Sequence, residues 1–197
     1  MKTALAIALA TLAIGSAQAD NVALNGVVST TGADFGNSAG WCCGAPAALS
    51  SVTDGTFLTN GQQWNEGTVF WSGALGADTI NIDLLHPATV TSLILQADNN
   101  DDYQIQYRDT SNAWHDLVVI SPNRSWGLDV GNATLATPVL ANGFRISAAG
   151  GDGDYAVAEF QAQGTVVAVP EPETYAMLAA GLALIGVAAR RRKGRSA

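Results

Sequence analysis

Apolar and polar residues alternate along short runs in the body of the chain, residues 20–168. The clearest run is 79–84, with the sequence TINIDL, in which every second residue is isoleucine or leucine. Such alternation is typical of a β-strand with one buried face. Further strands are predicted at 90–97, 103–108, 114–120, 143–147 and 155–163.

Clusters of glycine, asparagine, aspartate and serine separate these runs at intervals of about ten residues. The sequences DNNDD at 98–102 and GGDGD at 150–154 are the most pronounced, and both predict turns. The body shows no amphipathic helical pattern of useful length. A chain with many short strands closes most naturally as two packed layers of sheet. We therefore predict an all-β jelly-roll sandwich for residues 20–168.

The N-terminal end of the chain has a different pattern. A lysine at position 2 precedes an uncharged apolar run at 4–14, and the triplet Ala-Gln-Ala at 17–19 fits a small-x-small cleavage site. This combination predicts a secretory signal peptide over 1–19 and a mature chain that begins at Asp20.

A second apolar segment, 175–189, lies near the C-terminus and precedes the basic tail 190–197. We predict a single hydrophobic helix there, about 22 Å long, which is shorter than the roughly 30 Å of bilayer hydrocarbon. The basic tail favours a cytoplasmic C-terminus. An exposed, proline-containing linker comes before the helix, and it consists of Val169, Pro170, Glu171 and Pro172.

The linker, the apolar segment and the basic tail, in this order, resemble the PEP-CTERM sorting signal of Gram-negative bacteria. The resemblance covers 169–197. It implies processing by an exosortase, transit through the inner membrane, and delivery to the cell surface or extracellular matrix. A plain single-pass membrane anchor is the alternative.

The charge of the body limits its partners. The whole chain has a net charge of -8, but residues 20–168 contain fifteen acidic side chains, three arginines and no lysine, a net charge of -12. Such a surface argues against nucleic acid and against anionic membranes. Cations and neutral polar ligands remain open as partners.

Seven short motifs follow one another along the body: 21–24, 52–55, 71–72, 82–84, 103–107, 143–146 and 158–160. Their order resembles that of the discoidin-like, or coagulation-factor type C, modules of the galactose-binding-like fold. Leu85 stands where these modules have a glycine, and 32–48 is unusually rich in glycine and alanine. The resemblance implies a jelly-roll sandwich and a non-enzymatic, glycan-binding role.

The same resemblance implies a structural calcium ion bound by Asp54 and Glu159. Asp54 lies in the Asp-Gly motif, and Glu159 lies in the last of the seven motifs. Calcium takes six to eight oxygen ligands, so backbone carbonyl groups of residues 49–56 are expected to complete the site.

The five tryptophans all lie in the body. Trp71 and Trp114 occupy positions where the discoidin-like modules bury aromatic residues. Trp41, Trp64 and Trp126 lie in segments rich in small polar residues, where a large ring is harder to bury. These three are therefore candidates for contact with a ligand.

A sugar ring has an apolar face and a polar rim, so aromatic and hydrogen-bonding side chains together suit it. We predict that Trp41 and Trp126 stack on a neutral or acetylated polysaccharide and that Arg124 donates hydrogen bonds to it. The protein would then be an exported, non-enzymatic adhesion module. A structural matrix protein without ligand binding and a surface hydrolase are the alternatives.

Two other patterns have simpler interpretations. Residues 36–40 fit the Gly-x-Ser-x-Gly pattern of a hydrolase, but that motif needs a strand before the serine and a helix after it. The acidic loops 98–102 and 152–154 are interpreted as solvated turns rather than as metal sites. Tyr155 replaces the aspartate that a calcium-binding glycine-rich repeat would need at the end of 150–155.

Cys42 and Cys43 are adjacent and are the only cysteines. A disulfide that closes a long loop is therefore excluded within one chain. A vicinal disulfide, a bond to another chain and free thiols all remain open.

Overall fold

The computed structural model describes residues 19–41, 44–73, 78–124, 126–167 and 180–183. The chain divides into two units, Met1–Val166 and Val167–Ala197. In the second unit, residues 180–183 form one helical turn. The segments predicted as signal peptide, linker and basic tail lie outside the described residues, apart from residue 19. Among the described residues, no helix is long and apolar enough to cross a membrane.

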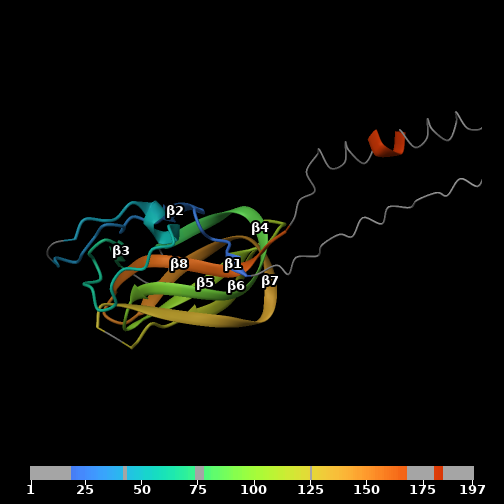
Figure 1. Ribbon diagram of the computed structural model, residues 1–197. Helices are drawn as coiled ribbons and strands as arrows, with labels where there is room; N and C mark the ends of the chain where they lie inside the picture. The colour runs from blue at the N-terminus through green and yellow to red at the C-terminus, as the bar shows by residue number, and fades with distance from the viewer. Residues whose placement is uncertain (1–18, 42–43, 74–77, 125, 168–179, 184–197) are drawn as a thin grey trace, which may run out of the picture. The chain divides into compact units, whose positions relative to one another are not determined.

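The first unit is built almost entirely from β-strands, as the alternating pattern predicts (Figure 1). One short 3-10 helix, η1 (Leu49–Thr53), precedes β3. The strands are β1 (Asp20–Asn21), β2 (Val27–Thr31), β3 (Val69–Ser72), β4 (Thr79–Asp98), β5 (Asp101–Arg108), β6 (Trp114–Ile120), β7 (Leu128–Gly150) and β8 (Asp154–Val166).

All strand pairs are antiparallel, in the order β1-β8-β4-β7-β5-β6, with β2 added to β4 and β3 added to β8. The long strands β4 and β7 pair with each other on both sides of a break in their register between Asp83 and Ala88. We call this break the bend. Before this bend β4 also pairs with β2, and after it β4 pairs with β8. The sheet thus folds over into two layers, and the bend leaves both ends of β4 at the same end of the sandwich.

The core lies between these two layers. Alternate residues of β4 point into it, so Ile80 and Ile82 before the bend, and Leu93 and Leu95 after it, are fully buried. Each such side chain contributes about 1.5–3 kcal/mol through removal of apolar surface from water. Phe144 of β7 and Phe160 of β8 meet across the core, with ring centroids 5.1 Å apart.

The predicted strand positions agree with the structure, but β4 and β7 are longer than predicted. The predicted strand 114–120 coincides with β6. The runs 79–84 and 90–97 belong to one continuous strand, which passes through the bend. Leu85, which replaces the glycine of the discoidin-like modules, lies at this bend and is 58% exposed. Leucine in place of glycine is therefore tolerated at this position, because the Leu85 side chain lies at the surface and not in the core.

The hydroxyl group of Tyr103 ties the two layers together, and its loss should destabilise the fold. The hydroxyl donates to the Ala156 carbonyl (3.1 Å) and accepts from the Ala156 N–H (3.3 Å), and Tyr103 is fully buried. We expect Tyr103→Phe to lower the free energy of unfolding by about 1–3 kcal/mol in urea titrations, because it leaves buried polar groups unbonded. The control Tyr107→Phe, at a half-buried tyrosine stacked on His115, should change it by less than about 0.5 kcal/mol. Equal effects of the two variants would contradict this role.

Candidate functional site

A cavity of about 110 Å³ lies at the end of the sandwich opposite the bend, where several loops meet. We call it the tryptophan pocket. Its lining comes from five segments that are far apart in the sequence: Trp41, Gln63, Trp64, Asp98, Asn99, Asn100, Trp126, Gly127 and Asp152. Aromatic rings and polar groups therefore share one concave surface.

The three tryptophans of the pocket differ in exposure. Trp41 and Trp126 are 54% and 65% exposed, whereas Trp64 is 6% exposed. Trp64 packs edge-on against Phe70, with ring centroids 5.5 Å apart, and this contact makes it a core residue as well as part of the lining. The two exposed rings are the ones available for stacking on a ligand.

A tight turn presents Trp41. The Trp41 N–H donates to the Ser38 carbonyl (2.8 Å), and the Ser38 hydroxyl donates to the Trp41 carbonyl (2.9 Å). Ala39 and Gly40 between them have φ values of 48° and 88°. The Asn37 amide attaches this turn to the carbonyl group of Ser72 in β3 (3.3 Å). Ser38 thus lies in a loop, where its hydroxyl bonds to the backbone. It does not lie directly between a strand and a helix, as the Gly-x-Ser-x-Gly motif of a hydrolase requires.

Close contact between two loops presents Trp126. Leu128 donates its N–H to the Gln62 carbonyl (2.9 Å), and the Leu128 carbonyl accepts the Gly61 N–H (2.8 Å). Gly127 has a φ of 64°, and a Cβ atom there would lie 2.2 Å from the Gln62 carbonyl oxygen. A glycine is therefore required beside Trp126.

Arg124 lies apart from the two exposed tryptophans. It lines a different, polar cavity of about 140 Å³ formed by β6, β7 and the loop between them. Its backbone N–H donates to the buried carboxylate of Asp129 (2.6 Å). The structure thus brings Trp41 and Trp126 to one pocket but places Arg124 at another.

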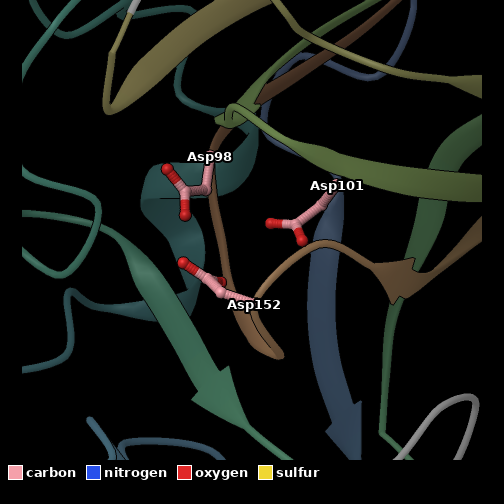
Figure 2. Close-up of side chains that lie close together, drawn as sticks. All are labelled: Asp98, Asp101 and Asp152. Carbon is pink, nitrogen blue, oxygen red and sulfur yellow. The ribbon is translucent and has the colours of Figure 1, made fainter.

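Three carboxylates, which we call the acidic cluster, lie close together (Figure 2). Two of them, Asp98 and Asp152, line the tryptophan pocket. Asp98 ends β4, Asp101 begins β5 and Asp152 lies in the β7–β8 turn. Their carboxylate oxygens lie within 4.8 Å of one another, so the cluster can hold a metal ion. Asp98 and Asp101 are only 3% and 1% exposed, so the interpretation of these loops as solvated turns is wrong for both residues.

Burial and mutual repulsion disfavour the charged forms of these groups. Burial, and after it the charge of Asp152, raises the pKa of Asp98 to about 7. Burial, and after it the charge of Asp98, raises the pKa of Asp101 to about 8. The ion pairs found among the described residues, Arg108–Asp83 and His115–Asp109, do not involve the cluster.

The residues predicted to bind calcium lie at a different place. Glu159 of β8 is fully buried, and its Oε1 accepts the Gly55 N–H (3.1 Å) beside Asp54. Its Oε2 has no hydrogen-bond partner among the described residues. Burial raises the pKa of Glu159 to about 7, and the charge of Asp54 adds to this increase. The structure thus connects the Asp-Gly loop to the closing strand through Glu159.

Cys42 and Cys43 lie outside the described residues, so their pairing stays a prediction. The sequence interpretation missed the acidic residues of the pocket, Asp98 and Asp152. The sequence showed only that 98–102 and 150–154 are acidic turns. Nothing in either turn indicated that the two turns lie next to each other in the fold.

Asp98 and Asp101 should make folding stability in EDTA decrease as pH rises. The folded pKa values, about 7 and about 8, lie above the value of 3.8 for a free carboxyl group. Their contribution to stability is therefore full below about pH 4 and is lost as pH rises through the folded values. Urea midpoints between about pH 5 and pH 8 should show this decrease for the wild type and a weaker one for Asp101→Asn, which cannot ionise. Asp116→Asn, at an exposed carboxylate, should behave as the wild type. A wild-type midpoint that rises over this range would contradict the assignment.

Comparison with known proteins confirms the predicted sorting motif and the predicted fold. Residues 168–193 match the family model of the PEP-CTERM protein-sorting motif. None of the curated proteins matches the chain.

Several solved carbohydrate-binding modules resemble the first unit. The family 32 carbohydrate-binding module of EndoD from Streptococcus pneumoniae has a TM-score of 0.52 and 16% identity, covering 73% of this chain and 98% of its own. The family 32 module of NanJ from Clostridium perfringens, in complex with galactose, has a TM-score of 0.50 and 15% identity, covering 74% and 98%. A module from Clostridium perfringens in complex with GalNAc-β-1,3-galactose has a TM-score of 0.52 and 12% identity, covering 73% and 98%.

Identities this low establish the fold and nothing further. The chain therefore combines a jelly-roll sandwich with the fold of family 32 carbohydrate-binding modules and, after it, a PEP-CTERM protein-sorting motif.

Proposed function

We propose that this protein is an exported carbohydrate-binding module that holds a neutral polysaccharide in its tryptophan pocket. The observation that carries the proposal is the presence of two exposed tryptophans, Trp41 and Trp126, on one cavity with polar side chains. Stacking covers the apolar face of a sugar, and the polar groups meet its hydroxyls. Neither the stacking nor the hydrogen bonding requires a catalytic side chain.

Charge selects the class of glycan. Asp98 and Asp152 line the pocket, and the body has a net charge of -12. Anionic polysaccharides are repelled by such a surface unless cations intervene, so neutral or acetylated chains fit better. The structurally similar modules in complex with galactose and with GalNAc-β-1,3-galactose support a ligand of this class.

A shallow site of this size binds weakly. Two exposed rings and a cavity of about 110 Å³ bury only part of a polysaccharide. We expect a Kd on the order of 0.1–1 mM per site, about 4–5.5 kcal/mol. Retention on the glycan at the surface or in the matrix then depends on several modules acting together.

Export supplies the place where this binding occurs. The sorting motif at 168–193 supports processing by an exosortase after transit through the inner membrane, and delivery to the surface or matrix of a Gram-negative cell. The signal peptide that the sequence predicts at 1–19 fits the same route. A surface hydrolase and a matrix protein without ligand binding remain the alternatives that the experiments must exclude.

A structural calcium ion between Asp54 and Glu159 fits this module. The Oε2 of the buried Glu159, which has no hydrogen-bond partner in the described part of the chain, offers one ligand. Asp54, next to Gly55, offers a second. A cation there would neutralise a carboxylate that burial otherwise disfavours.

Removal of either exposed ring should weaken glycan retention without unfolding the protein. We expect Trp41→Ala and Trp126→Ala each to weaken retention on the host exopolysaccharide about 5-fold or more, since an aromatic contact contributes about 1 kcal/mol or more. Affinity electrophoresis in exopolysaccharide gels measures this, and melting temperatures should stay within a few degrees of the wild type.

Phe57→Ala is the matched control, because Phe57 is an aromatic residue, 40% exposed, outside the pocket lining. It should bind as the wild type does. Unchanged retention of both tryptophan variants would reject the pocket as the glycan site, and turnover of chromogenic glycosides or esters would favour the hydrolase.

Intact mass of the surface protein tests the export route. We expect a chain from Asp20 to the neighbourhood of Pro170, because processing signals flank the body on both sides. Surface protein that still contains the basic tail 190–197 would exclude exosortase cleavage and indicate a retained anchor.

A further inference from the structure

We propose that Asp98, Asp101 and Asp152 bind a divalent cation of the calcium type at the wall of the tryptophan pocket. The ion keeps open coordination positions toward the cavity, and there it takes hydroxyl oxygens of the bound glycan. This second step rests on the proposed function, whereas the cation site does not.

The three carboxylates converge because of the way the sheet folds over. The two-residue turn between Asp98 and Asp101 crosses from the second part of β4 to β5. Asp101 lies opposite Gly150 in the β5–β7 ladder, so the β7–β8 turn with Asp152 follows beside it. Figure 2 shows the side chains directed toward a common space. Oxygens within 4.8 Å of one another suit one ion, since calcium–oxygen distances are about 2.3–2.6 Å.

Asp101 lies in this cluster almost fully buried and without a charged partner. It is 1% exposed, and in the described part of the chain it forms no ion pair. One of its carboxylate oxygens lies within 4.8 Å of a carboxylate oxygen of Asp98, which is 3% exposed. A buried carboxylate is costly unless a proton or a cation neutralises it. The arrangement therefore indicates a site built to receive positive charge.

Asn100 suits both the free and the occupied site. With its nitrogen turned toward Asp101, the side-chain amide lies 3.1 and 3.3 Å from the two carboxylate oxygens and donates to them. With its side-chain oxygen turned the same way, Asn100 offers the bound cation a neutral oxygen ligand. A calcium ion requires such ligands, because three carboxylates supply only part of the six to eight oxygens that it takes.

The donor set selects the class of metal. Carboxylate and amide oxygens suit hard cations such as calcium and magnesium, whereas zinc and copper favour nitrogen and sulfur ligands. The donors come from two turns rather than from a rigid octahedral cage. Calcium tolerates such irregular geometry, and magnesium does not.

The acidic cluster and the tryptophan pocket share residues. Asp98 and Asp152 line the cavity together with Trp41 and Trp126, while Asp101 is not part of the lining. An ion held by all three carboxylates is therefore closed by Asp101 on the buried side and open toward the cavity. Adjacent sugar hydroxyls are neutral oxygen ligands, so coordination and stacking can act on the same sugar.

Metal titration tests the cation site with the full-length protein after treatment with EDTA. Calcium chloride is titrated by calorimetry, and terbium is titrated by its emission on excitation of the tryptophans that line the pocket. We expect Asp101→Asn and Asp152→Asn to weaken this binding about 10-fold or more and to lose the sensitised emission. Asp116→Asn should match the wild type. Asp54→Asn should remove only a separate ion at Glu159 and leave the pocket emission unchanged.

The folding of these variants is checked by melting in EDTA. There Asp101→Asn should be at least as stable as the wild type, because an amide cannot acquire the negative charge that burial disfavours. In saturating calcium the order should reverse, since the wild type binds the ion at the cluster more tightly and is stabilised more by it. Wild-type melting curves that coincide in calcium and EDTA, or terbium emission that survives in both cluster variants, would overturn the cation site.

Glycan retention in calcium and in EDTA tests the second step. We expect the retention of the wild type on exopolysaccharide to be at least about 5-fold lower in EDTA than in calcium. In calcium, Asp101→Asn should be retained at least about 5-fold less than the wild type. Trp126→Ala should still bind terbium, because its substitution removes only the stacking contact. Equal retention in both buffers would overturn coordination of the glycan and leave the cation site in place. Absence of retention in every buffer, with calcium binding intact, would overturn the proposed function instead.

Discussion

The pairing of β4 with β7 is the interaction on which the rest of the structure depends. The two strands contain 20 and 23 residues, whereas strands of about 5–6 residues are usual. A pair of this length cannot stay flat over a small core, so it bends between Asp83 and Ala88 and gives each half its own partners. The two halves then bury Ile80, Ile82 and Leu93 between them.

This bend also determines where the loops meet. Because both ends of β4 and β7 lie at the same end of the sandwich, the turns that follow Asp98 and Gly150 become neighbours. The loops that present Trp41 and Trp126 reach the same place through hydrogen bonds to Ser72 and Gln62. The pocket is thus a consequence of the topology, which holds five separate segments around one cavity.

The proposed site combines two kinds of recognition with opposite physical requirements. Exposed rings bind by removing apolar surface from water, and they need no partner when the site is empty. Buried carboxylates such as Asp98 and Asp101 are costly when charged, so the empty site is stabilised by protonation. A cation replaces those protons and turns repulsion between the carboxylates into ligation.

The sequence by itself determined the features that depend on local pattern. Alternation predicted β6 at its observed bounds, and motif order predicted the sandwich fold and the sorting motif at the C-terminus. Only the tertiary structure decided which loops meet, because Asp98 and Asp152 belong to turns that no local pattern connects. It also separated Arg124 from Trp126, although they are only two positions apart in the sequence. The Arg124 N–H is bonded to Asp129, whereas Trp126 lies beside the contact between Leu128 and Gln62, so the two residues line different cavities. Burial of Asp101 was likewise invisible in an acidic loop, because its cover comes from the end of β7 and from Gly151 in the turn that follows.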